Sequence, residues 1–340
     1  MPRASCITHQ AVKDNQMLLE VLPKLYQIVV PTPFAVGPVN CYVATSEPLT
    51  LIDTGPLHAD SRAALHAGLA ELGLRGSDLR RIVITHAHAD HYGLAAELVR
   101  ESSAELWTHR HNRATLEQYT AARAQRDAFY MQLMIESGVP LEERQRIADS
   151  RRVGERFSEA VKIDRMLAEG DQINLADRMW QVYHMPGHAG GLITFFEPEA
   201  RLLLSNDHLL REISSNPIVE PAPDGGPRPH RLVEYLHHLQ RAVDLKPVIA
   251  WTSHGEPVHD VEKLVRQRLH FHVRRADKIL GLIGAGERSA FQIAEPLFGR
   301  LNGVDSFLAL SETIGHIDWL AEQGRVVASV RDGVLYWRKV

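Results

Sequence analysis

The sequence contains few cysteines, few aromatic residues and no large excess of charge of either sign. Cys6 and Cys41 are its only cysteines, and Cys6 lies in a polar N-terminal stretch, so we expect no disulfide scaffold. Cys41, within VNCYVA, is expected to pack as a small hydrophobe in a strand rather than to bind metal. The formal net charge of -4 gives no global attraction to nucleic acid or an anionic membrane, so such partners would need a local patch.

Long hydrophobic runs are also missing. No uninterrupted apolar stretch approaches the roughly 20 residues of a transmembrane helix, and the N-terminus MPRASCITHQAVKDNQ has no secretory signal pattern. We therefore expect a cytoplasmic protein without a membrane partner. The hydrophobic fraction of 44% and the charged fraction of 24% are typical of globular proteins, and 340 residues predict a main domain with a smaller one attached.

Strand patterns alternate with amphipathic helices over most of the chain, which predicts an α+β fold. The opening strands end at LTLID, a helix with a glycine stop covers 59–72, and the β-branched strand RIVIT leads directly into HAHADH. Strands resume at QINLADRMWQVYHM, LITFFEP, RLLLSND and PVIAWTSHG, with a helix over 231–243. The charged segment from about 112 to 163 is predicted to be a helical insertion or lid.

The last 80 residues have a different character. Helical patterns cover 261–283, 289–298 and 306–323, and two β-rich runs then flank Asp332-Gly333, a strong hairpin signal. Three helices followed by a hairpin predict a winged-helix-like domain. We therefore divide the chain into a catalytic domain over 20–259 and a small C-terminal domain over 260–340.

Histidine is unusually frequent for its type, with 19 copies, and several stand where a strand ends. One turn after RIVIT contains His86, His88, Asp90 and His91. The alternating His86 and His88 can face one ion, while Asp90 and His91, further round the turn, can reach a second. A His-rich surface turn is the simpler explanation, but three later strands also end in a metal-ligand type: His188, Asp207 and His254. Imidazole and carboxylate suit zinc and are also accepted by iron or manganese.

This order of H-x-H-x-D-H, a later His, an Asp and a last His resembles the metallo-β-lactamase superfamily, and LIDTG with Asp53 resembles its opening strand and turn. The resemblance implies a four-layer αββα sandwich with the site at one edge between two sheets. It implies a first metal on His86, His88 and His188, a second on Asp90, His91 and His254, and Asp207 bridging the two. Asn206 departs from the pattern, because the family often has glycine before the bridging aspartate.

For several other residues near the motifs, the sequence is compatible with two roles. Asp53 is either a carboxylate that hydrogen-bonds a ligand imidazole or a residue that stabilises its own turn. Asp90 is either a ligand alone, which we favour, or also a catalytic group that orients the nucleophile or accepts its proton. His184 and His208 either contact substrate or pack. His109 and His111 mimic a ligand pair, but the set of seven is complete without them.

The resemblance implies a dinuclear metal-dependent hydrolase in which a metal-bound hydroxide attacks a thioester, ester or lactone carbonyl. We expect two divalent ions, with zinc favoured, and a small acyl-type substrate, because apolar residues gather near the expected mouth. These are Phe34, Phe129, Tyr130, Met131, Met134 and the Pro/Gly-rich loop after Ser214.

Two alternatives stay open. The C-terminal segment resembles the small domain of a superfamily branch that includes an endoribonuclease and thioesterases, so cleavage of single-stranded RNA is the first alternative. Its phosphate contacts would be Arg325, Arg331, Arg338 and Lys339. The second is a DNA-binding regulator, which is disfavoured because the expected recognition helix over 309–324 is acidic. The oligomeric state is not predicted.

Overall fold

The computed structural model describes residues 17–117, 119–299 and 303–340. Cys6 lies outside this range, as does the N-terminal stretch 1–16 for which the sequence predicts no signal segment. Within it, no helix is long and apolar enough to cross a membrane. Cys41 is buried in a strand, as predicted.

The first sheet has seven strands whose spatial order follows the chain. Its first four strands pair antiparallel and the rest pair parallel, so the carboxyl ends of β4, β5, β6 and β7 lie at one edge. The strands are β1 (Leu18–Leu22), β2 (Leu25–Val30), β3 (Val39–Ala44), β4 (Thr50–Ile52), β5 (Arg81–Ile84), β6 (Glu105–His109) and β7 (Arg165–Leu167).

The second sheet has five strands in the order β12-β11-β10-β9-β8. The segment 172–185, read from the sequence as one strand region, is a hairpin, because Ala176 and Asp177 adopt positive φ between its two arms. The strands are β8 (Gln172–Leu175), β9 (Arg178–His184), β10 (Ile193–Glu197), β11 (Leu202–Asn206) and β12 (Ile249–Thr252).

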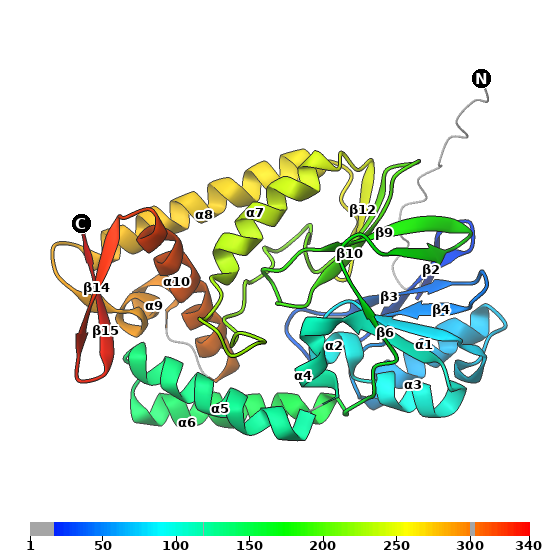
Figure 1. Ribbon diagram of the computed structural model, residues 1–340, viewed down its shortest axis with the longest axis horizontal. Helices are drawn as coiled ribbons and strands as arrows, with labels where there is room; N and C mark the ends of the chain where they lie inside the picture. The colour runs from blue at the N-terminus through cyan, green and yellow to red at the C-terminus, as the bar shows by residue number, and fades with distance from the viewer. Residues whose placement is uncertain (1–16, 118, 300–302) are drawn as a thin grey trace.

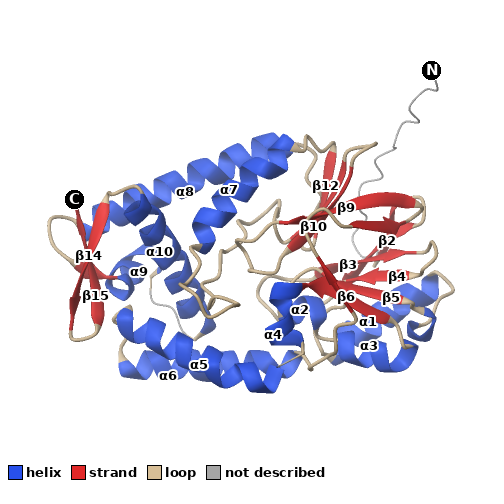
Figure 2. Cartoon of the chain, in the orientation of Figure 1, coloured by secondary structure: helices blue, strands red, loops and turns tan. Residues whose placement is uncertain are grey.

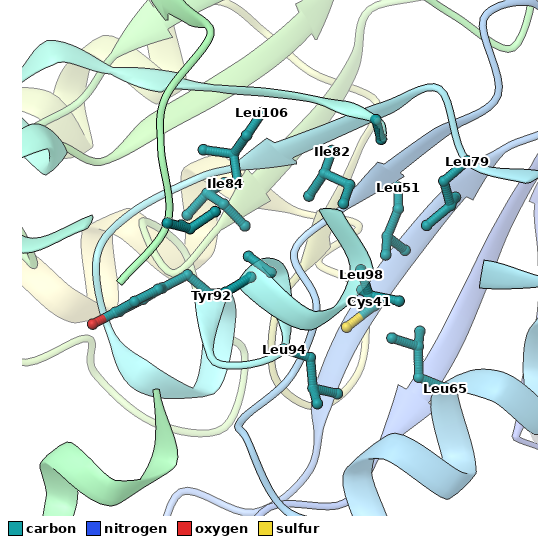
Figure 3. Close-up of a cluster of buried hydrophobic side chains, with 14 of the residues drawn as sticks. Cys41, Leu51, Leu65, Leu79, Ile82, Ile84, Tyr92, Leu94, Leu98 and Leu106 are labelled. Carbon is teal, nitrogen blue, oxygen red and sulfur yellow. The ribbon is translucent and has the colours of Figure 1, made fainter. Parts of the chain in front are cut away.

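Three hydrophobic clusters define four layers. The helices α1 (Ala59–Glu71) and α3 (Ala95–Ser102) bury Leu65, Leu69 and Leu98 against the outer face of the first sheet (Figure 3). The two sheets face each other across a second cluster that includes Tyr42, Trp180, Phe195 and Trp251. The helices α7 (Arg231–Asp244) and α8 (Val261–Ile283) cover the second sheet (Figure 1). The predicted αββα sandwich is therefore confirmed.

Helices α5 (Tyr119–Glu136) and α6 (Leu141–Gly154) form the predicted helical segment and extend away from the sheets (Figure 2). They pack on the C-terminal helices in one cluster that joins Met134 and Ile147 to Ile279, Phe307 and Ile314. The remaining elements are α2 (Ala89–Tyr92), α4 (Arg113–Leu116), α9 (Ala290–Phe298), α10 (Val304–Glu322), β13 (Arg288–Ser289), β14 (Val326–Arg331) and β15 (Val334–Lys339), with 3-10 turns at Gly76–Asp78, Arg110–Asn112 and Glu155–Phe157.

The C-terminal segment contains the three predicted helices and the hairpin, and β13 adds a third strand to that hairpin. Sequence reasoning missed β13 because it is only two residues long. The domain boundary and the winged-helix assignment stay predictions.

A buried histidine pair joins α8 to α10. His272 Nδ1 lies 3.1 Å from His316 Nε2, and His316 Nδ1 donates to the carbonyl oxygen of Glu312 at 2.7 Å. Burial lowers the pKa of His272 to about 3 and that of His316 to about 4, from an ordinary value of 6.5. Both rings are therefore neutral in the folded protein at neutral pH.

We expect this pair to make the fold sensitive to acid. Below pH 6.5 the two histidines bind protons in the unfolded chain but stay neutral in the folded chain. The free energy of unfolding therefore falls as the pH is lowered. Between pH 6.5 and 5 each histidine accounts for up to about 2 kcal/mol. Urea unfolding at pH 7 and pH 5 should show a smaller loss for His272→Gln than for the wild type. The exposed His270→Gln on the same helix is the control, and an equal loss in all three proteins would contradict the assignment.

Candidate metal centre

The HAHADH motif follows the carboxyl end of β5: His86 and His88 lie in the turn after the strand, and Asp90 and His91 lie in α2. The parallel pairing of Ile52 with Val83 places Asp53 beside this turn. The chain passes so close to the segment before α1 that a Cβ on Gly93 would lie 2.3 Å from the backbone nitrogen of Leu57. Only glycine fits there, so this residue fixes how the turn enters α3.

Three histidines from two turns face one point. His86 Nε2 and His188 Nε2 each lie 2.9 Å from His88 Nδ1. His188 comes from the turn between β9 and β10, about 100 residues after the other two. The structure thus brings together the three side chains that the sequence assigned to a first metal.

A second group lies beside the first. His254 Nε2 is 3.4 Å from Asp90 Oδ2, and His91 Nε2 is 3.7 Å from the same oxygen. His254 follows β12, so this group also joins two distant segments. The three residues are those predicted for a second metal.

Asp207, directly after β11, stands between the two groups. Its Oδ2 lies 3.3 Å from His188 Nε2 and 3.5 Å from His91 Nε2, and its Oδ1 lies 3.7 Å from His254 Nε2. One carboxylate therefore faces both groups, as a bridging ligand would. All seven predicted ligands meet in one place, and their role as ligands stays a prediction that this geometry fits.

The buried atoms of the centre have the chemistry of a cation site. His91 Nε2, His254 Nε2 and Asp207 Oδ1 are buried without a hydrogen-bond partner in the described part of the chain. Such atoms are costly unless something satisfies them, and a divalent cation would satisfy all three. The residues present thus fit a pair of metal ions.

The protonation states of Asp90 and His88 suit metal binding, whereas the neighbouring carboxylates, Asp207 first, raise the pKa of His91 and His254, so these two rings must release a proton when an ion binds. Burial would raise the pKa of Asp90, but His91 and His254 outweigh it and lower the pKa to about 2. Burial, reinforced by the nearby His188, lowers the pKa of His88 to about 3. At neutral pH the centre therefore offers a carboxylate and a neutral imidazole, which are the forms that bind metal.

Acceptors behind the histidines hold the rings in place. Asp53 Oδ2 accepts from His91 Nδ1 at 2.8 Å, the carbonyl of Asn216 from His188 Nδ1 at 2.9 Å, and the carbonyl of Pro38 from His254 Nδ1 at 2.7 Å. Each bond leaves the lone pair of Nε2 directed at the centre. Asp53 also accepts from the backbone N–H of Thr85 at 2.9 Å, so it both supports a ring and fixes the turn.

Asn206 preserves the turn at which the family often has glycine. Its φ is 51°, in the left-handed region that asparagine tolerates better than most residues. Its side-chain amide donates to the carbonyl of Ile193 at 2.7 Å. The substitution therefore keeps the backbone geometry that aims Asp207 into the centre.

The four histidines that the sequence left open, His109, His111, His184 and His208, do not join the centre. His109, His111 and His184 form a further cluster that sequence reasoning did not assemble. The rings of His109 and His184 are stacked with centroids 3.9 Å apart, and His111 and His184 both donate to the carbonyl of Gly190. We interpret the cluster as a support for the loop that carries His188. His208 is fully buried and contacts the carbonyl of His238 at 3.0 Å.

A cavity of about 640 Å³ lies over the centre and is lined by five of the seven predicted ligands. Phe34, Tyr130 and the loop after Ser214 line it, as predicted. The prediction was wrong for Phe129, Met131 and Met134, which do not line the cavity and instead pack in the hydrophobic cluster shared with the C-terminal helices. The apolar part of the wall also includes Leu210, Ile213, Ile218, Val304, Phe307 and Leu308.

Comparisons with known proteins agree with this geometry. The profile of the metallo-beta-lactamase superfamily matches residues 35–254. The chain is 33% identical over 311 residues to the "Probable metallo-hydrolase YqjP" of Bacillus subtilis, which covers 92% of this chain and 96% of that protein. It also resembles the crystal structure of the metallo-beta-lactamase family protein TTHA1429 from Thermus thermophilus, with a TM-score of 0.81, 27% identity, and coverage of 94% and 100% of the two chains.

A shorter match has a more specific name. The acyl-coenzyme A thioesterase MBLAC2 of Gallus gallus is 47% identical over 47 residues, which is 14% of this chain and 17% of that protein. Such a short match concerns one segment only.

Proposed function

The chain belongs to the metallo-β-lactamase superfamily and is a metal-dependent hydrolase, and we propose that it cleaves acyl substrates at a thioester, ester or lactone carbonyl. The observation that carries this proposal is the cavity over the candidate metal centre, in which the centre and a mainly apolar wall face the same space. Apolar walls favour an acyl chain, because about 0.8 kcal/mol is gained for each CH₂ removed from water.

Two divalent ions would be held by the seven residues, one by His86, His88 and His188 and one by Asp90, His91 and His254, with Asp207 between them. Zinc suits these donors, and iron or manganese would also be accepted. When bound, the ions acidify water and stabilise the negative charge that develops at the carbonyl under attack.

Asp90 is best treated as a ligand. The contact between its Oδ2 and His254 Nε2 and its low pKa make it a carboxylate committed to the centre and a weak proton acceptor at neutral pH. We therefore assign the orientation of reacting groups to the centre and the cavity wall, and no separate general-base role to Asp90.

Neither nucleic-acid alternative is favoured. Among the described residues that line the cavity, none comes from the hairpin that carries the four proposed phosphate contacts, and two of those contacts, Arg325 and Arg331, pair with Asp277 and Glu287. The helix expected to read DNA, α10, is buried along most of its length. A reading helix must be exposed to enter a groove.

The proposal predicts hydrolysis of acyl thioesters whose rate depends on chain length. With protein reconstituted with zinc, we expect kcat/KM to rise by up to about fourfold for each added methylene until the cavity is filled. The measurement is release of free thiol from a series of straight-chain acyl thioesters. Esters, lactones, β-lactams and single-stranded RNA are tested beside them.

Chelated protein is the control, and metal analysis of each preparation shows how many ions the active form holds. Turnover of RNA without turnover of any acyl compound would overturn the proposal. Turnover that ignores chain length would show that the apolar wall does not hold the substrate.

A further inference from the structure

A guanidinium group stands in the wall of the cavity, outside the candidate metal centre. Arg151 lies in the last turn of α6 and lines the cavity. Its Cζ is 3.6 Å from the ring centroid of Tyr130 and 4.9 Å from that of Phe307. These two rings meet edge to face, with centroids 5.1 Å apart. The α5 and α10 helices thus hold the guanidinium between aromatic side chains, where a cation is attracted to the ring face.

The charge of Arg151 is not balanced by a neighbouring carboxylate. Among the described residues it forms no ion pair within 4.0 Å, whereas three other charged residues of the wall are paired: Arg126 and Glu155 with each other at 3.0 Å, and Glu220 with Arg231 at 3.2 Å. Asp305 also lines the cavity, but it is exposed to solvent and does not pair with Arg151.

A half-buried guanidinium without a carboxylate is suited to bind an anion. The ring faces satisfy its flat side, while guanidinium has five N–H donors along its edge and no acceptor. A carboxylate or phosphate group offers two oxygens that match this edge. The wall around it is mainly apolar, which strengthens such a contact because water screens it less.

We propose that Arg151 binds an oxyanion carried by the substrate outside the acyl bond that is cleaved. This rests on the proposed acyl hydrolysis and narrows its substrate class to anionic acyl compounds with an apolar portion. Arg151 then determines specificity, and takes no part in the bond cleavage itself. The oxyanion is either a carboxylate at the far end of the acyl chain or a phosphate on the leaving group.

Matched substrates distinguish these two sources. One pair consists of an acyl thioester whose acyl chain ends in a carboxylate and a thioester of equal length whose acyl chain ends in a methyl group. The other pair is the octanoyl thioester of 4′-phosphopantetheine and that of pantetheine, which lacks the phosphate. The proteins are the wild type, Arg151→Gln, Arg151→Lys and Arg152→Gln, all loaded with zinc. Arg152 is the control, because it lies in the same turn of α6 with its side chain 60% exposed.

We expect Arg151→Gln to lower kcat/KM about ten- to hundredfold for the anionic member of one pair, mainly through a higher KM. The neutral member should change less than about threefold, as should both members with Arg152→Gln. Arg151→Lys should retain part of the preference, because it keeps the charge and loses the flat fork. Equal losses on both members of each pair would overturn the proposal.

A binding measurement separates this proposal from the proposed hydrolysis. The thioether analogues of the same four compounds cannot be hydrolysed, and their affinities for the wild-type holoenzyme are measured by calorimetry at low and high salt. Tighter binding of an anionic analogue that depends on Arg151 would support the subsite even if no thioester were cleaved. Equal affinities of anionic and neutral analogues for the wild type would reject the subsite even if thioesters were cleaved, and would do so without any variant.

Discussion

Asp207→Ala should lose most of both the bound metal and the activity. This carboxylate faces both halves of the centre, with its two oxygens 3.3 to 3.8 Å from the nitrogens of four histidines. Without it no carboxylate faces all four histidines, because Asp90 contacts only His91 and His254, and two bound cations would lose the anion expected to hold both. A loss of about 4 kcal/mol of transition-state stabilisation corresponds to a roughly thousandfold lower kcat/KM. Two quantities are measured: the metal content by elemental analysis, and the rate at which acyl thioesters are hydrolysed.

Asp149→Ala provides the matched control, since that carboxylate is 61% exposed on α6 and far from any predicted ligand in the sequence. It should keep two metal ions and the full rate. Asp207→Asn tests whether charge or shape matters, because the amide keeps the volume and removes the anion. If Asp207→Ala retained two tightly bound ions, the bridging assignment would fail.

The fold and the candidate ligands could be predicted because both depend on local signals. RIVIT and RLLLSND are apolar runs of strand length, and each ends in a ligand type. His88 follows β5 of the first sheet and His188 follows β9 of the second, and these strand ends lie together at one edge of the sandwich, where His88 Nδ1 and His188 Nε2 are 2.9 Å apart. The helix over 261–283 has the bounds that its periodicity predicts.

The wall of the cavity could be predicted only in part, because the rest depends on how distant segments pack. Periodicity indicates that Tyr130 and Met134 lie on a helix, but not which of them faces the cavity and which faces the C-terminal helices. The contribution of Phe307 to the wall likewise depends on the docking of α10 beside α5. The predicted insertion and C-terminal domain share one hydrophobic cluster, a contact between segments more than 100 residues apart.

Asp53→Asn should weaken the second metal position about a hundredfold while leaving the first largely intact. Asp53 Oδ1 accepts from the backbone N–H of Thr85, so the amide oxygen of asparagine will take that position and its NH₂ will face His91. The NH₂ group of the asparagine can donate only to an unprotonated His91 Nδ1. A neutral His91 ring whose Nδ1 is unprotonated carries its proton on Nε2. That proton points at Asp207, where the lone pair has to bind the ion.

Comparison with Asp53→Ala isolates this effect of the tautomer. Alanine removes the acceptor but imposes no donor, so His91 can still place its lone pair at Nε2, and metal should bind more tightly than in the asparagine variant despite the greater loss of contacts. Zinc titration with a competing chelator gives the two affinities separately for each protein. If Asp53→Asn bound the second ion as tightly as the wild type, the role of Asp53 would be limited to stabilising the turn through Thr85. Other buried residues would then have to orient the His91 ring.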